Sequence, residues 1–319
     1  MPHIVGESLN QTIWGAALAA LTLSACGNAA PQQPAASATA GVPAQRGGGQ
    51  AYELLGTEVW DLPDPATGRT YQLFVNLPQS YGQEPQRRYP VLYVTDADYA
   101  FPVIRQISRR LNVEGPKIEE FILVGLSYAK GDDGMTSRRR DYTPTPNGPS
   151  NAPAEAKHGE GAQHQAWLRD QALPFVTGRY RTAPGRNILL GHSYGALLAT
   201  QILFSEPEMF GRYVLGSPSL WYDKRHMFTV EAAYAAKHRD LKAKIFLYTG
   251  EYEAVRKGDA RFNQETDLVA DSRAFADTLR KRGYPGLTLE AEILNDEDHV
   301  PVAPCGFTRA LKFLLPARK

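Results

Sequence analysis

Cysteine is almost absent from this chain, and the shortage excludes most covalent cross-linking. Two cysteines occur among the 319 residues, Cys26 and Cys305. If Cys26 is modified, as argued below, Cys305 has no partner within the chain and no disulfide framework can form. We expect its thiol to be buried and inert. The cysteines and the seven histidines also lack the spacing of zinc ligands, so the sequence predicts no metal site.

An excess of charge of either sign is also missing. Lys and Arg number 35 against 34 Asp and Glu, which leaves a formal net charge of +1. No basic bias points to nucleic acid, and no repeat of aromatic and basic residues points to single-strand binding. With 43% hydrophobic and 22% charged residues, the composition is that of an ordinary globular protein. We expect no nucleic-acid partner.

The apolar run near the N-terminus, Ile13–Ala25, is too short to span a bilayer but has the length of a secretory h-region. It ends in Leu-Ser-Ala-Cys-Gly, which resembles the bacterial lipobox, whose cysteine is acylated and becomes the mature N-terminus. Lys and Arg are missing before it, which departs from the usual pattern. The sequence predicts a lipoprotein-type signal peptide over residues 1–25, with Cys26 as the lipid anchor. The expected location is the periplasmic face of a bacterial envelope membrane, with secretion to the periplasm as the alternative.

Residues 26–50 are rich in Ala, Pro, Gln and Gly and contain almost no large apolar side chain. Such a segment cannot bury enough apolar surface to fold. We therefore expect a disordered tether over residues 26–50, followed by one folded domain over residues 51–319.

Within that domain, short apolar runs alternate with runs of helical period. The expected strands are 57–62, 70–77, 89–95, 120–126, 186–190, 210–215, 243–249 and 287–294. The expected helices are 101–111, 165–180, 196–203, 229–238, 268–282 and 302–315, with a long polar loop over 127–160. Alternating strands and helices predict an α/β fold: a mostly parallel central sheet with helices on both faces and an antiparallel hairpin at its N-terminal edge.

A Gly-x-Ser-x-Gly motif, Gly191–Gly195, lies where the strand 186–190 meets the helix 196–203. A serine between two glycines at a strand-to-helix corner is typical of the nucleophile elbow of α/β-hydrolases. The glycines are needed because a side chain at either position would clash in so tight a turn. The motif predicts the α/β-hydrolase fold with Ser193 as its nucleophile.

A serine hydroxyl needs a base beside it, and in this fold the acid and then the histidine follow the serine along the chain. His299 comes after the last predicted strand and before the last helix, where the base belongs. Two carboxylates, Glu251 and Glu253, follow the strand 243–249. The spacing favours Glu253 as the acid that orients the imidazole, with Glu251 as the alternative.

The tetrahedral intermediate needs donors for its oxyanion. One is the backbone N–H of Tyr194, at a helix N-terminus where the dipole helps. The second is expected from the loop after the strand 89–95, from the amide of Asp98, with Ala97 or Tyr99 as alternatives. The acidic side chains of Asp96 and Asp98 must then point away from the oxyanion.

Four segments together resemble one esterase family of the α/β-hydrolases. They are Tyr89–Asp96, Ser137–Pro144 with its Arg-x-x-Asp-Tyr-Thr-Pro pattern, Gly216–Trp221 and Gly250–Glu253. Ala97 departs from the family, which has glycine there. The family includes periplasmic trilactone siderophore esterases, esterase D-like enzymes and feruloyl-esterase-like domains, and the resemblance runs from about residue 51 to the C-terminus.

This resemblance implies a serine esterase that works through an acyl-enzyme without a cofactor and acts on a small-molecule ester. A ferric siderophore lactone is the candidate substrate. Arg138 and its neighbours Arg139 and Arg140 suit carboxylates, catecholates or phosphates; the alternative is a solvated face or an ion pair with Asp141. Trp221 is a candidate to stack on an aromatic substrate or to wall the pocket.

Other functions remain open at this point. A carbohydrate-ester (feruloyl or acetyl) esterase, a peptidase and an acyltransferase all use this fold. A binding lipoprotein that keeps the fold without the chemistry is a further alternative, although it would have no need of both Ser193 and His299.

Overall fold

The computed structural model describes residues 51–317, which belong to one compact unit of the chain. The predicted signal peptide, the lipid anchor Cys26 and the tether 26–50 lie outside the described residues. Among residues 51–317, no helix has both the length and the apolar character needed to cross a membrane.

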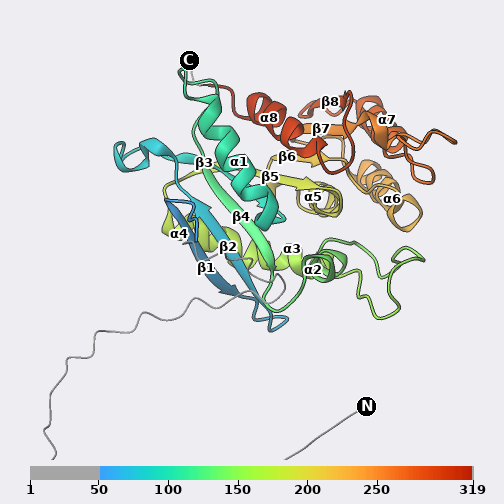
Figure 1. The fold of residues 1–319 in the computed structure, drawn as a ribbon, viewed down its shortest axis with the longest axis horizontal. Coiled ribbons are helices and arrows are strands. Elements are labelled where there is room, and N and C mark those ends of the chain that lie inside the picture. The colour runs from blue at the N-terminus through green and yellow to red at the C-terminus, as the bar shows by residue number, and fades with distance from the viewer. Residues whose placement is uncertain (1–50, 318–319) are drawn as a thin grey trace, which may run out of the picture. The chain divides into compact units, whose positions relative to one another are not determined.

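The described residues form an eight-stranded sheet in the order β1-β2-β4-β3-β5-β6-β7-β8 (Figure 1). The strands are β1 Thr57–Pro63, β2 Thr70–Asn76, β3 Tyr89–Thr95, β4 Ile122–Ala129, β5 Thr182–His192, β6 Arg212–Gly216, β7 Lys244–Gly250 and β8 Thr288–Leu294. β2 is antiparallel to both its neighbours, β1 and β4, and the pairs from β4 through β3 to β8 are parallel. The predicted mostly parallel sheet with an antiparallel hairpin at its edge is confirmed.

Helices cover both faces of this sheet. α1 (Ala97–Leu111) and α8 (Val302–Leu314) pack on one face, where they share an apolar core with β3 to β8. The other face carries α3 (Gly161–Trp167), α4 (Leu173–Arg179), α5 (Tyr194–Ser205), α6 (Tyr222–Lys237) and α7 (Leu268–Arg282). Figure 1 shows α1 in front of the strands, with α4 and α5 behind them. All seven residues of β3 are buried because both sides of a central parallel strand face helices.

One helix lies inside the predicted polar loop 127–160, so that prediction was wrong in part. α2 spans Gly134–Asp141 and has no apolar stripe that periodicity would detect. It is held instead by polar contacts. The Asp133 carboxylate caps its N-terminus by accepting from the amides of Met135 and Thr136, and the Ser137 hydroxyl accepts from the Ala129 amide at 3.0 Å.

Four of the predicted helices begin earlier than predicted, and α1 and α6 are two of them. α1 begins at Ala97 rather than residue 101, directly after β3. α6 begins at Tyr222 rather than residue 229, and its first turn contains Asp223, Lys224 and Arg225 at φ of 45°, 54° and 64°. Left-handed backbone is unfavourable for residues other than glycine, so the sequence pattern does not indicate this start.

Cys305 is exposed, which corrects the expectation of a buried thiol. The buried residues of α8 include Val302, Ala303, Gly306 and Phe307. Cys305 falls between them on the opposite side of the helix, because a helix turns about 100° per residue.

The short single-turn helices are η1 (Gln79–Gly82), η3 (Pro207–Met209) and η4 (Glu251–Glu253), and a π-helical turn, η2 (Leu168–Ala172), joins α3 to α4. Of these, η4 bears on the site described next, because it carries both candidate acids directly after β7.

Candidate active site

The Gly-x-Ser-x-Gly motif forms a sharp turn between β5 and α5. Ser193 has φ 58° and ψ −118°, outside the regions that residues other than glycine usually adopt. A Cβ on Gly191 would overlap the backbone of Gly195, and a Cβ on Gly195 would overlap the Thr95 hydroxyl. The Ser193 amide donates to the Gly216 carbonyl at 2.8 Å. Tight packing of β3, β5 and β6 therefore holds the serine in this conformation, as expected of a nucleophile elbow.

Glu253 and His299 meet through a hydrogen bond. The Nδ1 atom of His299 lies 2.5 Å from Oε2 of Glu253, whose side chain is 1% exposed. The other oxygen, Oε1, accepts from the Ser217 hydroxyl at 2.5 Å and from the Gly250 amide at 2.8 Å. The carboxylate is thus fully hydrogen-bonded and fixed toward the imidazole. Glu251, the alternative acid, instead accepts from the Asp296 amide at 2.9 Å.

Ser193 and His299 line one cavity of about 240 Å³, together with Asp96, Tyr128 and Arg138 among others. Within the described chain, the Ser193 hydroxyl has its hydrogen bond with Ser219 Oγ, at 3.4 Å, and has none with His299. Catalytic hydrogen bonds are often long or misaligned before substrate binds. The structure therefore brings the serine and the imidazole to the same cavity without joining them.

The hydrogen bonds of the backbone amides at the start of α1 show which of the predicted oxyanion donors are free to donate. Tyr99 and Ala100 donate their backbone N–H groups to the Asp96 carbonyl, at 3.1 and 2.9 Å. Ala97 and Asp98 occupy the first two positions of α1, where a helix supplies no acceptor for the N–H groups. Tyr99 is therefore unsuitable as a donor, and Asp98 and Ala97 stay available. The Asp98 side chain is exposed and accepts from the Ser127 hydroxyl at 3.1 Å.

Asp96 and Arg138 form a buried ion pair in the wall of the cavity. The Nε atom of Arg138 lies 2.9 Å from Asp96 Oδ1, and the Tyr128 hydroxyl donates to the same oxygen at 2.9 Å. Burial raises the pKa of Asp96, and Arg138 opposes that rise. Burial would lower the pKa of Arg138, but the Asp96 carboxylate outweighs it and the pKa is raised. Arg138 thus balances the charge of Asp96, which lines the same cavity as Ser193.

His192 lies against the imidazole of His299, with ring centroids 4.9 Å apart. Its Nδ1 atom is 3.2 Å from the Tyr248 hydroxyl, and the side chain is buried. Burial first, and the positive charge of His299 second, lower the pKa of His192 to about 3. A neutral ring is therefore packed against the predicted base.

Trp221 is absent from the lining of the cavity among the described residues. Its indole packs on Tyr194 and Tyr222, at centroid distances of 6.2 and 6.1 Å. Arg138 does line the cavity, and its guanidinium lies 5.6 Å from the centre of the Tyr194 ring. Of the two predicted substrate-binding residues, the structure thus places Arg138 in the lining of the cavity that holds the serine, whereas Trp221 packs on Tyr194 outside that lining.

Several residues of the site were not expected from the sequence, among them Tyr128, His192 and Ser217. His192 and Ser217 stand within motifs that were identified, Gly191–Gly195 and Gly216–Trp221, but their contacts depend on how distant segments meet. Tyr128, at the end of β4, has no motif at all. Within residues 51–317, no group of three or more His, Cys, Asp or Glu side chains is arranged to hold a metal ion.

Residues 65–292 match the model of a protein family described as "Putative esterase". The chain belongs to this esterase family. Ferri-bacillibactin esterase BesA of Bacillus subtilis (strain 168) is 27% identical to it over 282 residues, which cover 84% of this chain and 93% of BesA. The siderophore enterobactin esterase of Emericella nidulans is 28% identical over 182 residues, 53% of this chain and 60% of that protein. The protein is a carboxylic-ester hydrolase.

Solved structures share the fold of this esterase. The siderophore hydrolase EstA from Aspergillus nidulans superimposes with a TM-score of 0.69 at 22% identity, covering 81% of this chain and 94% of EstA. An IroE-like serine hydrolase from Shewanella oneidensis gives a TM-score of 0.68 at 25% identity, covering 80% of this chain and 79% of that one. The predicted α/β-hydrolase fold is confirmed.

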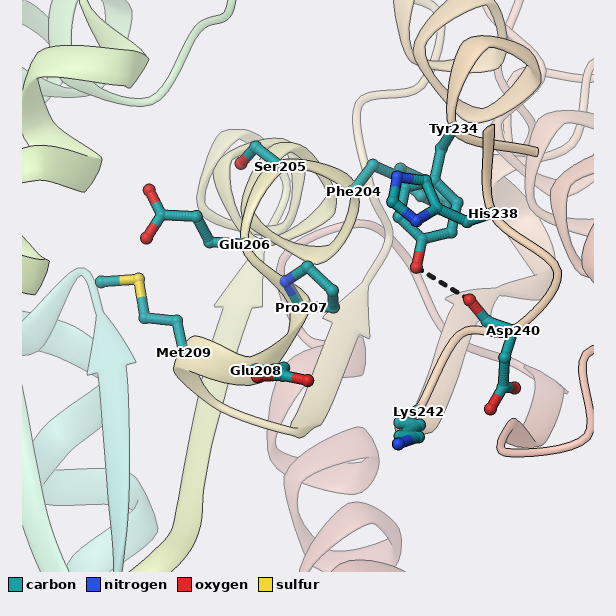
Figure 2. Close-up of a pocket in the computed structure, with 10 residues that line it drawn as sticks. All are labelled: Phe204, Ser205, Glu206, Pro207, Glu208, Met209, Tyr234, His238, Asp240 and Lys242. Carbon is teal, nitrogen blue, oxygen red and sulfur yellow. Dashed lines mark hydrogen bonds between the residues drawn. The ribbon is translucent and has the colours of Figure 1, made fainter. Parts of the chain in front are cut away.

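A larger cavity of the esterase, about 500 Å³, lies at the far end of α5 (Figure 2). Since α5 has 12 residues, this end is about 18 Å from Ser193. Tyr234 and His238 stack there with centroids 4.2 Å apart, and the Tyr234 hydroxyl donates to the Asp240 carbonyl at 2.9 Å. The described residues that line this larger cavity include no nucleophile with a base beside it. The volume of a cavity alone therefore does not identify the reactive site.

Proposed function

We propose that this protein is a serine esterase of siderophore esters, in which Ser193, His299 and Glu253 form the catalytic triad. The observation that carries the proposal is the hydrogen bond between the buried Glu253 carboxylate and His299 Nδ1, at 2.5 Å. The imidazole of His299 lines the same cavity as the elbow serine, Ser193. A carboxylate at Nδ1 leaves Nε2 without a proton and able to accept one.

In the proposed reaction, Ser193 Oγ attacks the ester carbonyl carbon while His299 Nε2 takes the hydroxyl proton. The backbone N–H groups of Tyr194 and Asp98 donate to the oxyanion. The ester C–O bond then breaks, His299 returns the proton to the leaving alkoxide, and an acyl-serine remains. A water molecule, deprotonated by His299, releases the acid and restores the serine. Glu253 stabilises the imidazolium at each transfer.

The proposal that the substrate is a siderophore ester is supported by two relatives of the chain. Their names give ferri-bacillibactin and enterobactin as the siderophores. It is also supported by the cavity, which is open to solvent at His299, whose side chain is 39% exposed. A bulky ester can therefore approach the serine from outside.

The test is product analysis by mass spectrometry with wild-type protein and Ser193→Ala. Both are incubated with an iron-loaded trilactone siderophore, a feruloyl sugar and an acetylated sugar. We expect the wild type to open the trilactone and the variant to leave it intact. Cleavage of the sugar esters alone would refute the siderophore assignment while keeping the esterase, and binding of the siderophore without turnover would favour a non-catalytic binding protein.

For the location, we propose that Cys26 carries a lipid that holds the esterase at the periplasmic face of a bacterial membrane. The support is the lipobox-like segment Leu23–Gly27. Expression of Cys26→Ser beside the wild type, followed by membrane fractionation and labelling with a fatty-acid probe, tests it. We expect label and membrane association in the wild type only; label on neither protein would contradict the anchor.

A further inference from the structure

Three consecutive cations in α2, Arg138 to Arg140, have different surroundings. Arg138 is paired with Asp96 at 2.9 Å. Arg140 makes a two-pronged contact with Asp141, at 2.8 Å through both Nε and Nη2, and a third contact with Asp132 at 2.7 Å. The guanidinium of Arg139 has no ion pair or hydrogen bond with any described residue. Internal carboxylates therefore balance two of the three charges and leave the middle one free.

Arg139 lines a cavity of about 460 Å³ between α2 and the segment 153–157. Lys157 lines the same cavity and likewise has no ion pair within the described chain. Of the carboxylates there, Asp133 is already used by the amides of Met135 and Thr136, which it caps. These hydrogen bonds leave the charge of Asp133 in place, and Glu155 adds a second carboxylate to the lining. Neither carboxylate forms an ion pair with Arg139 or Lys157, so the guanidinium of Arg139 keeps its donors for a ligand.

Neighbouring residues of α2 line this cavity and the one that holds the serine. Arg138 precedes Arg139 directly and lines the Ser193 cavity. Burial raises the pKa of the Tyr194 phenol, and the charges of Arg138 and Arg139 both oppose the rise. The Arg139 charge therefore acts on the phenol of the residue that follows the nucleophile.

We propose that Arg139, assisted by Lys157, forms an anion-binding subsite beside Ser193 that selects esters with negative charge remote from the scissile carbonyl. This rests on the proposed esterase function and adds its substrate class: an anionic ester rather than a neutral one. A guanidinium without an internal partner can donate two parallel hydrogen bonds to a carboxylate or catecholate. The guanidinium groups of Arg138 and Arg140 are instead already paired with carboxylates of the protein.

The experiment uses 4-nitrophenyl monoesters of dicarboxylic acids of increasing length, from succinate through adipate and suberate to sebacate. Each is compared with the analogue that ends in a primary amide instead of the carboxylate. We expect the wild type to prefer the carboxylate form at one or more lengths by about tenfold in kcat/KM, the size of one charge-assisted hydrogen bond. The difference should appear in KM, because the group lies away from the reacting atoms.

Arg139→Gln should abolish that preference and leave turnover of the amide esters unchanged, while Arg139→Lys, which keeps the charge, should retain most of it. Arg110→Gln is the matched control, because it removes the same charge at the far end of α1, about 20 Å from the site by helix rise. A preference that survives Arg139→Gln, that disappears equally in Arg110→Gln, or that is absent from the wild type overturns the subsite.

Calorimetric binding of the free dicarboxylates separates this proposal from the esterase function, because it requires no turnover. We expect measurable binding to the wild type that is lost in Arg139→Gln. Failure to hydrolyse any of the esters would refute the proposed function, whereas equal binding by both proteins would refute the subsite alone.

Discussion

Substitution of Glu253 by glutamine is the sharpest test of the proposed triad. In the native site, Oε1 accepts from Ser217 and Gly250, and Oε2 accepts from His299 Nδ1. The glutamine carbonyl can keep the first pair of donors, which places its NH₂ group against Nδ1. Two donors cannot face each other, so His299 must carry its proton on Nε2 and can no longer accept one from Ser193.

A histidine held in the wrong tautomer lowers kcat by about 10⁴-fold, which corresponds to about 5.4 kcal/mol of activation free energy. The fold should be little affected, since two of the three hydrogen bonds remain and the third forms again with its direction reversed. We expect the free energy of unfolding to change by less than about 2 kcal/mol. Hydrolysis of a 4-nitrophenyl ester gives kcat, and urea denaturation gives the stability.

Glu251→Gln is the matched control, because Glu251 lies two residues away in η4 and contacts the Asp296 amide instead of His299. We expect its kcat to stay within a few-fold of the wild type. Retention of more than a tenth of kcat by Glu253→Gln, or an equal loss in Glu251→Gln, would refute the assignment of Glu253.

Three further predictions concern stability. Asp96→Asn leaves Arg138 buried without its counter-charge and should lower the free energy of unfolding by about 3 kcal/mol in urea; a change under about 1 kcal/mol would show that the pair is well solvated. The pKa of His192 is lowered by burial to about 3 from 6.5, so the unfolded chain binds a proton in this window that the native chain does not. Stability should therefore fall as the pH drops from 6.5 toward 3, by about 1.4 kcal/mol per pH unit from this residue, and His192→Asn should reduce that slope; an unchanged slope would be contrary evidence. Lys224→Gly, at φ 54°, should raise stability by about 1 kcal/mol, whereas Ala233→Gly in the regular part of α6 should lower it by about as much; equal losses in both would speak against a left-handed turn.

Much of the fold is readable from the sequence because its signals are local. The buried strands are short apolar runs, as in β3, where both faces meet helices. The turn between β5 and α5 is readable because the chain passes itself so closely at Gly191 and Gly195 that no side chain fits. By contrast α2 and the start of α6 were missed, because capping, ion pairs and left-handed backbone have no periodic signature.

The sequence by itself determined the order of the strands along the chain, the position of Ser193 and the segment in which a histidine follows, since each depends on residues adjacent in the chain. Tertiary structure alone decided which glutamate contacts His299, which of the three arginines stays unpaired and which ring packs against the imidazole. These contacts join residues such as Ser217 and Glu253, or Asp96 and Arg138, that are 36 and more positions apart. Their partners depend on the few ångströms by which the packed sheet and its loops bring such side chains together.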